Sequence, residues 1–237
     1  MNVLIACEES QEVCRAFRAK GHEAYSCDIQ ECSGGHPEWH IKDDVTAYLN
    51  GKHEFTTQDG KRHRISEWDL IIAHPPCTYL SCVTTRHLSL RCNSAQKVVD
   101  RMWNLAKAAV FFMQCYFADC KRVAVENPSG FMSTLFKKPD CTIHPYYFAE
   151  SEKDVENYQK KRTCFWLRGL EPLERTSELP PPPPLGFTKS GKPLNFAEMG
   201  GKIAGLQHKG NAAAARSKTF PGIAKAMAEQ WGDIKED

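Results

Sequence analysis

Thirteen residues in the first third of the chain, D-L-I-I-A-H-P-P-C-T-Y-L-S at 69–81, constrain the fold most. The apolar run at 70–73 shows no alternation with polar residues, and this predicts a strand buried on both faces, as in a parallel sheet. Pro75 and Pro76 end the strand, because proline fixes φ and donates no backbone N–H. Cys77 is therefore expected in a stiff loop at the carboxyl end of a central strand, where open α/β sheets bind their ligands. The alternative is a small buried thiol that follows an ordinary strand end.

The N-terminal residues predict a strand–helix–strand unit. Residues 2–6 and 23–27 are short apolar runs, and residues 11–20 carry apolar side chains at helical spacing after Ser10, an expected N-cap. This pattern is typical of the front half of a nucleotide-binding fold, so we predict a mainly parallel sheet with helices on both faces. Asp28 closes the second strand, where an acid commonly binds a ribose diol. The loop after the first strand lacks G-x-G-x-x-G, so a nucleoside is a better candidate ligand than a dinucleotide. The alternative to a ribose-binding role is that Asp28 is an ordinary loop residue.

A second apolar run, residues 122–125, ends in Glu126 and Asn127 followed by a proline. A long helix is expected between the two runs, because residues 94–118 repeat apolar side chains at helical spacing. If the two strands are neighbours, the thiol of Cys77 and the carboxylate of Glu126 converge at one edge of the sheet.

Charge and cysteine content limit the class of protein. Residues 1–60 carry 5 basic and 11 acidic side chains and residues 61–237 carry 26 and 18, so the net charges of the two parts are −6 and +8. This asymmetry favours a polyanion partner for the second part, with chance imbalance as the alternative.

The 11 cysteines show neither C-x-x-C nor paired Cys/His spacing, so we expect no metal site and no disulfides, with most thiols buried. No apolar run is long enough to span a bilayer and no signal peptide is recognisable, which predicts a cytoplasmic protein without a membrane partner.

A run of five prolines within residues 179–185 divides the chain. We expect a catalytic domain over 1–178, and over 179–237 a stiff spacer, a basic tail and a final helix that returns to the catalytic body. Residues 199–228 contain no acid, so their basic side chains are predicted to contact phosphates. The segment carries Lys202, Lys209, Arg216, Lys218 and Lys225, and the first four are the residues predicted to touch DNA.

The two loop motifs carry a family resemblance. His-Pro-Pro-Cys at 74–77, followed by Glu-Asn-Pro at 126–128, resembles the Pro-Pro-Cys and Glu-Asn-Val motifs of the S-adenosylmethionine-dependent DNA cytosine-5 methyltransferases. The chain is similar along most of its length to short phage-encoded proteins of that kind. The resemblance implies a Rossmann-like class I methyltransferase fold in which Cys77 adds to carbon 6 of cytosine. Glu126 would then hold the base at N3 and at its amino group while carbon 5 takes the methyl group.

The resemblance also implies the remaining site residues. Asp28 would bind the ribose of the S-adenosyl-L-methionine cofactor and Asp44 its adenine, while Arg162 would clamp the flipped nucleotide or its phosphate, as in the Gln-x-Arg-x-Arg segment of the family. The complete cofactor site that the resemblance implies consists of Ala6, Cys7, Glu8, Ser10, Asp28, Ile29, Asp44, Val45, His74 and Pro75. The DNA-facing set outside the tail consists of Pro76, Thr78, Ser81, Arg86, Asn127 and Lys161.

Three other functions are compatible with the sequence. Pro-Pro also suits amino-group methyltransferases of cytosine N4 or adenine N6, although they carry an aromatic residue where this chain has Cys77. The protein is alternatively a cytosine modifier acting on free nucleotide or RNA, or an inactive DNA-binding decoy. Double-stranded DNA is the expected partner, no obligatory protein partner is indicated, and the span after Leu167 is too short for a full target-recognition domain.

Overall fold

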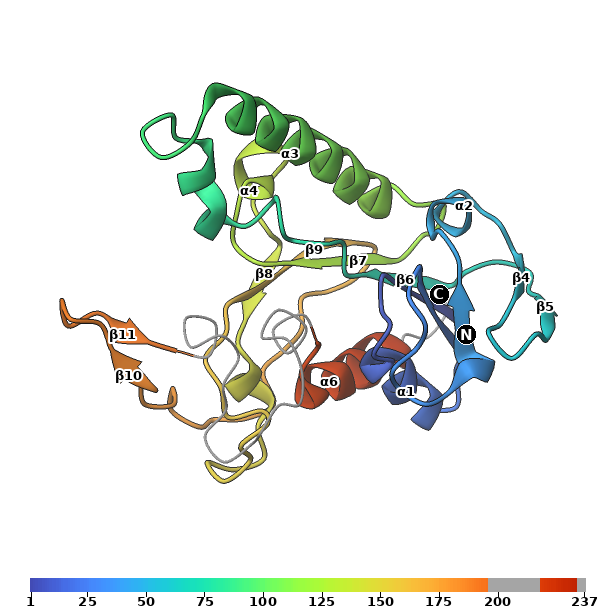
Figure 1. Cartoon of the computed structure of the whole chain (residues 1–237). Helices are drawn as coiled ribbons and strands as arrows, with labels where there is room; N and C mark the ends of the chain where they lie inside the picture. Colours follow the sequence, from blue (N-terminus) through green and yellow to red (C-terminus); the bar gives the residue numbers. More distant parts are fainter. Residues whose placement is uncertain (196–217, 234–237) are drawn as a thin grey trace.

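A seven-stranded sheet forms the centre of the protein (Figure 1). The computed structural model describes residues 1–195 and 218–233. From one edge of the sheet to the other, the strands are β3 (His40–Lys42), β2 (Glu23–Asp28), β1 (Asn2–Ala6), β6 (Leu70–Ala73), β7 (Val123–Asn127), β9 (Thr163–Arg168) and β8 (Cys141–Ile143). All neighbours from β3 to β7 are parallel, whereas β9 is antiparallel to both β7 and β8. The fold is therefore mixed α/β with a largely parallel sheet, compatible with the predicted Rossmann-like architecture.

Helices cover both faces of this sheet (Figure 1). The helices α1 (Glu12–Ala19) and α6 (Pro221–Gly232) pack against each other on one face. The other face carries α2 (Thr46–Leu49), α3 (Ala95–Tyr116) and α4 (Met132–Leu135). Short 3-10 turns lie at η1 (Pro37–Trp39), η2 (Cys82–Leu88) and η3 (Pro145–Phe148).

Each central strand contributes alternate side chains to two apolar layers. Leu4 and Ile71 point into the layer beneath α3, and Val3, Ile5 and Leu70 into the layer shared with α1 and α6. All five are fully buried, as expected of parallel strands covered on both sides. No helix in the described ranges is long and apolar enough to cross a membrane.

Residues 50–66 form a part of the fold that packs on the sheet through one side chain. It forms a hairpin of β4 (Glu54–Thr56) and β5 (Arg62–Arg64). Phe55 at its centre is only 5% exposed and packs against the rings of Tyr25 and Trp68. Glycines and mixed charges dominate the segment, so its single buried aromatic was not recognised. A second hairpin, β10 (Gly186–Phe187) with β11 (Pro193–Leu194), follows the proline run.

The predicted N-cap at Ser10 is wrong. The residue before α1 is Gln11, in the left-handed region with φ 60°, and its side chain caps nothing. The buried carboxylate of Glu8 instead accepts hydrogen bonds from the backbone N–H groups of Val13 (2.7 Å) and Cys14 (3.2 Å). A carboxylate suits this place because the first N–H groups of a helix lack partners and carry positive partial charge.

The expectation that most thiols are buried is also wrong. Five of the eleven cysteines are buried, three are partly buried, and Cys77, Cys82 and Cys92 are exposed. All eleven are thiols without a disulfide. The three exposed cysteines lie in or near the loop that follows β6.

Candidate active site

The loops after β6 and β7 are joined into one unit. β6 and β7 are neighbours, with Ala73 paired to Val125, so both chains leave the sheet at the same edge. The side-chain amide of Asn127, itself 2% exposed, donates to the carbonyl oxygen of Pro75 (2.8 Å). Further along, Phe131 N–H donates to the Leu80 carbonyl oxygen (2.8 Å). The structure therefore brings the Pro-Pro-Cys and Glu-Asn-Pro loops together.

Gly130 makes this union sterically possible. It forms an isolated antiparallel bridge with Ser81, and a Cβ added to Gly130 would clash with the carbonyl oxygen of Leu80. Only glycine permits so close an approach of two backbones. Gly130 was not among the predicted site residues, although a glycine two residues after the Glu-Asn-Pro proline is a signal that a close approach would explain.

Cys77 lies exposed at the start of a turn. Its carbonyl oxygen accepts from the N–H groups of Leu80 (3.1 Å) and Ser81 (3.0 Å). From α3, the Arg101 guanidinium donates to the Thr78 carbonyl oxygen (2.7 Å) and lies 4.4 Å from the centre of the Tyr79 ring. The loop that carries the thiol is thus fixed by its own turn, by α3 and by the loop after β7.

Glu126 is held as a carboxylate at the end of β7. Its side chain is 15% exposed, and its Oε2 lies 3.1 Å from Nδ1 of His74, which is 9% exposed. Burial opposes ionisation, but the hydrogen bond from His74 and the positive charges of Lys161 and His74 outweigh it and lower the pKa of Glu126. The structure therefore favours the ionised form of the acid. Because a carboxylate only accepts hydrogen bonds, Nδ1 of His74 is the donor.

His74 acts on two acidic side chains. Its Nδ1 faces Glu126, and its charge acts on buried Glu8, whose pKa is raised by burial and lowered in part by His74 and by the N–H groups of α1. Within the described part of the chain, Nε2 of His74 has no hydrogen-bond partner. The resemblance implied that both His74 and Glu8 bind cofactor, but their contacts here are with Glu126 and the start of α1.

A cavity of about 10 Å³ adjoins Glu126 on the side of α6. Its lining includes the polar side chains of Lys161 and Thr163 and the apolar side chains of Phe220 and Met227. A space of this size holds a single water molecule at most. The C-terminal helix therefore closes one side of Glu126.

A second group of polar residues lies at the carboxyl ends of β1, β2 and β3. Burial raises the pKa of the Cys7 thiol to about 12, and the nearby charges of Asp28 and Asp44 add to this effect. Asp28 is partly buried and accepts from Gln30 N–H (2.9 Å). Asp44 is exposed, and hydrogen bonds from the Thr46 side chain and backbone lower its pKa. The two acids predicted to bind cofactor thus converge beside Cys7.

Cys7 has φ 61°, a left-handed backbone that is uncommon outside glycine. Its N–H donates to the Cys27 carbonyl oxygen (2.8 Å), which turns the chain sharply at the end of β1. A position of this kind is usually filled by glycine, and strained backbone outside glycine often marks a functional turn. Cys7 belongs to the cofactor site that the resemblance implies, but its left-handed conformation could not be predicted from the sequence.

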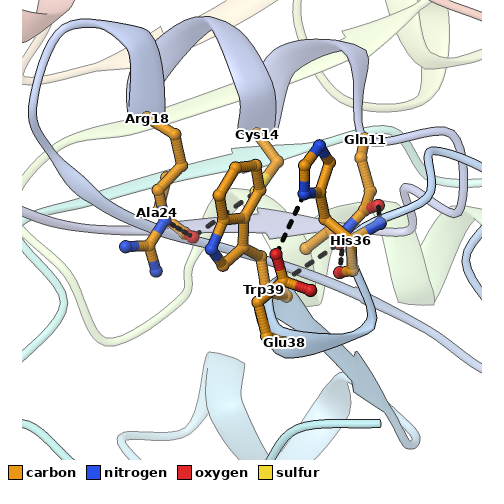
Figure 2. Close-up of polar contacts among 8 residues, drawn as sticks. Gln11, Cys14, Arg18, Ala24, His36, Glu38 and Trp39 are labelled. Atoms are coloured by element: carbon orange, nitrogen blue, oxygen red, sulfur yellow. Dashed lines mark hydrogen bonds and ion pairs between the residues drawn. The ribbon is translucent and has the colours of Figure 1, made fainter. Parts of the chain in front are cut away.

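The loop after β2 is tied to the start of α1, as Figure 2 shows. The buried amide of Gln11 donates to the His36 carbonyl oxygen (2.8 Å) and accepts from His36 N–H (3.0 Å). The His36 ring stacks on Trp39 at 3.8 Å, and the Arg18 guanidinium lies 5.3 Å from the centre of the Trp39 ring (Figure 2). These contacts fix the loop that follows Asp28.

The other predicted residues have varied exposure. Among the cofactor set, Ile29 is 74% exposed, whereas Ala6, Ser10, Val45 and Pro75 are buried. Of the residues predicted to contact DNA or to clamp the flipped nucleotide, Pro76, Thr78, Arg86, Arg162 and Lys218 are exposed, and Ser81 and Lys161 are partly buried. Lys202, Lys209 and Arg216 lie outside the described residues.

In the ranges that the structure describes, no group of three or more His, Cys, Asp or Glu side chains is arranged to hold a metal ion. Compared with profiles of protein families and with curated protein sequences, the chain gives no match. The arrangement itself offers an exposed thiol and an ionised acid on joined loops, beside two acids at the ends of neighbouring strands.

Proposed function

We propose that the protein is an S-adenosylmethionine-dependent DNA methyltransferase that modifies carbon 5 of cytosine. The observation that carries the proposal is the joining of the Cys77 loop to the Glu126 loop through Asn127 and Gly130. A thiol and a carboxylate on one rigid unit fit covalent attack on a base that is held at its polar edge.

The strand arrangement supports the same proposal. A parallel sheet with one reversed strand, β9, inserted beside the edge strand β8 is typical of class I methyltransferases. The acids Asp28 and Asp44 at the ends of β2 and β3 fit a nucleoside ligand, since carboxylates accept hydrogen bonds from ribose hydroxyls and from an adenine amino group. The left-handed backbone of Cys7 beside these acids fits a close approach of ligand to the chain at the end of β1.

The chemistry assigned to the protein's own residues is as follows. The Cys77 sulfur donates an electron pair to carbon 6 of cytosine, which makes carbon 5 nucleophilic enough to take a methyl group. The proton on carbon 5 then passes to solvent water and the carbon 6–sulfur bond breaks, which restores both the thiolate and the aromatic base. Bound S-adenosylmethionine supplies the methyl group. Oε2 of Glu126 accepts from His74, which leaves Oε1 to accept from the cytosine amino group.

Nucleoside analysis tests the product. DNA incubated with the protein and S-adenosylmethionine carrying a deuterated methyl group is hydrolysed and its nucleosides are identified by mass spectrometry. We expect labelled 5-methylcytosine with the native protein and none with Cys77→Ser. Label on cytosine N4 or adenine N6 would instead establish an amino-group methyltransferase, and label only in RNA or free nucleotide would change the substrate class.

A further inference from the structure

Helix α3 is apolar on two opposite faces. Leu105, Phe112 and Cys115 face the sheet and are buried. On the other side, Val99, Trp103, Val110, Met113 and Phe117 are 59%, 64%, 57%, 37% and 60% exposed. An apolar helix face is normally covered by other residues, so a second apolar face left at the surface indicates a missing layer.

The outward residues follow a strict spacing. Together with exposed Ala106 they recur at intervals of 4, 3, 4, 3 and 4 residues, and we call them the outer seam: Val99, Trp103, Ala106, Val110, Met113 and Phe117. This spacing keeps one narrow stripe in line along the whole helix and is the pattern by which two helices pair. It therefore indicates a helical partner.

We infer that the outer seam is the interface of a homodimer in which α3 packs antiparallel against α3 of a second copy. Two charged residues on one flank of the outer seam support pairing with α3 of a second copy, rather than with a different helix. Asp100 and Lys107 lie on either side of Trp103, so in an antiparallel pair that crosses there Asp100 of each copy faces Lys107 of the other. One twofold axis thus generates two opposite-charge contacts around a central pair of tryptophans.

The exposed area is of the right order for such an interface. An aromatic side chain can bury roughly 150–250 Å², so Trp103 and Phe117 alone expose about 200–300 Å². Val99, Val110, Met113 and the 52% exposed Met102 extend this patch. One partner contributes about 800 Å² to a standard interface, so the exposed face of α3 supplies a substantial part of that area.

Sedimentation equilibrium of the full-length protein tests the inference. We expect a species of twice the 26.8 kDa chain mass at micromolar concentration. Trp103→Glu and Val110→Glu should each raise the dimer dissociation constant by at least about 30-fold, the effect of losing a central apolar anchor. Phe187→Glu is the matched control, because Phe187 is 65% exposed on the distant β10 hairpin and should leave the mass unchanged.

A charge exchange tests the pairing itself. Asp100→Lys and Lys107→Asp should each weaken the dimer, and the double variant should restore it. A native monomer at about 100 µM, or a dimer that survives Trp103→Glu and Val110→Glu with unchanged affinity, would refute the interface. If the single charge variants weaken the dimer and the double variant does not restore it, the antiparallel pairing is wrong. None of these measurements depends on methyl transfer.

Discussion

Removing the imidazole of His74 should reverse the pKa shift of Glu126. In the native protein the hydrogen bond of 3.1 Å and two positive charges lower this pKa despite burial. His74→Asn shortens the side chain and removes the bond and one of the charges, so burial becomes dominant and the pKa rises above its ordinary value. A hydrogen bond to a charged group contributes about 1.5–3 kcal/mol, and this is the size of the stability effect expected from its loss.

The pH dependence of stability follows from the direction of this shift. A carboxyl whose folded pKa is lowered stabilises the protein above its unfolded pKa, and this contribution is lost as the pH falls through the folded pKa. With the pKa raised, ionisation of Glu126 opposes folding instead. The variant should therefore lose about 1.5–3 kcal/mol relative to the native protein near pH 5.5, and progressively less as the pH falls and Glu126 of the native protein becomes protonated.

Urea unfolding between pH 3 and pH 5.5 measures this difference, and His36→Asn is the matched control. His36 makes the same kind of pair with Glu38 at 2.9 Å, but the two side chains are 37% and 43% exposed, so its loss should cost under about 1 kcal/mol. In a Glu126→Gln background, His74→Asn should have a much smaller effect than in the native protein. Equal losses in the two histidine variants, or a His74 effect that does not change with pH, would refute the assignment.

Three further predictions concern the cofactor, the loops and the tail. Asp28→Ala should weaken S-adenosylmethionine binding by calorimetry by about 1.5–3 kcal/mol, whereas Asp59→Ala on the β4–β5 turn should not change it. Gly130→Ala should lower the melting temperature through its clash with Leu80, and Gly186→Ala, which has open space around it, should not. Replacing Lys202, Lys209, Arg216 and Lys218 by alanine should flatten the salt dependence of DNA affinity by about one unit of slope for each residue, and an unchanged slope would exclude phosphate contacts.

The parts of the fold that could be predicted are those fixed by local pattern. Uninterrupted apolar runs identified β6 and β7, and helical spacing identified α3 almost to its ends at Ala95 and Tyr116. The position of Cys77 in a loop beyond β6 followed from the two prolines. These features depend on neighbouring residues, so the sequence around each one was sufficient.

Features that depend on distant contacts could not be predicted. The pKa of Glu126 is set by His74, 52 residues earlier, and by Lys161 on the approach to β9. Phe55 is buried by Tyr25 and Trp68 from other elements. Ser10 looked like an N-cap, but the more strongly accepting carboxylate of Glu8 reaches the N–H groups of α1 once the chain turns at left-handed Cys7. In each case the deciding partner is identified only by the three-dimensional structure.

Covalent trapping tests the central claim most directly. DNA that contains 5-fluorocytosine cannot lose its carbon 5 substituent as a proton, so an adduct through Cys77 should persist once the methyl group has been transferred. With S-adenosylmethionine present, we expect a denaturation-resistant protein–DNA complex in which mass spectrometry of peptides locates the modification on Cys77. Cys82→Ser, a change at another exposed thiol five residues away, should still form the complex, and Cys77→Ser should not. A native protein that methylates ordinary DNA but leaves no trapped complex, or a complex that survives Cys77→Ser, would contradict the account.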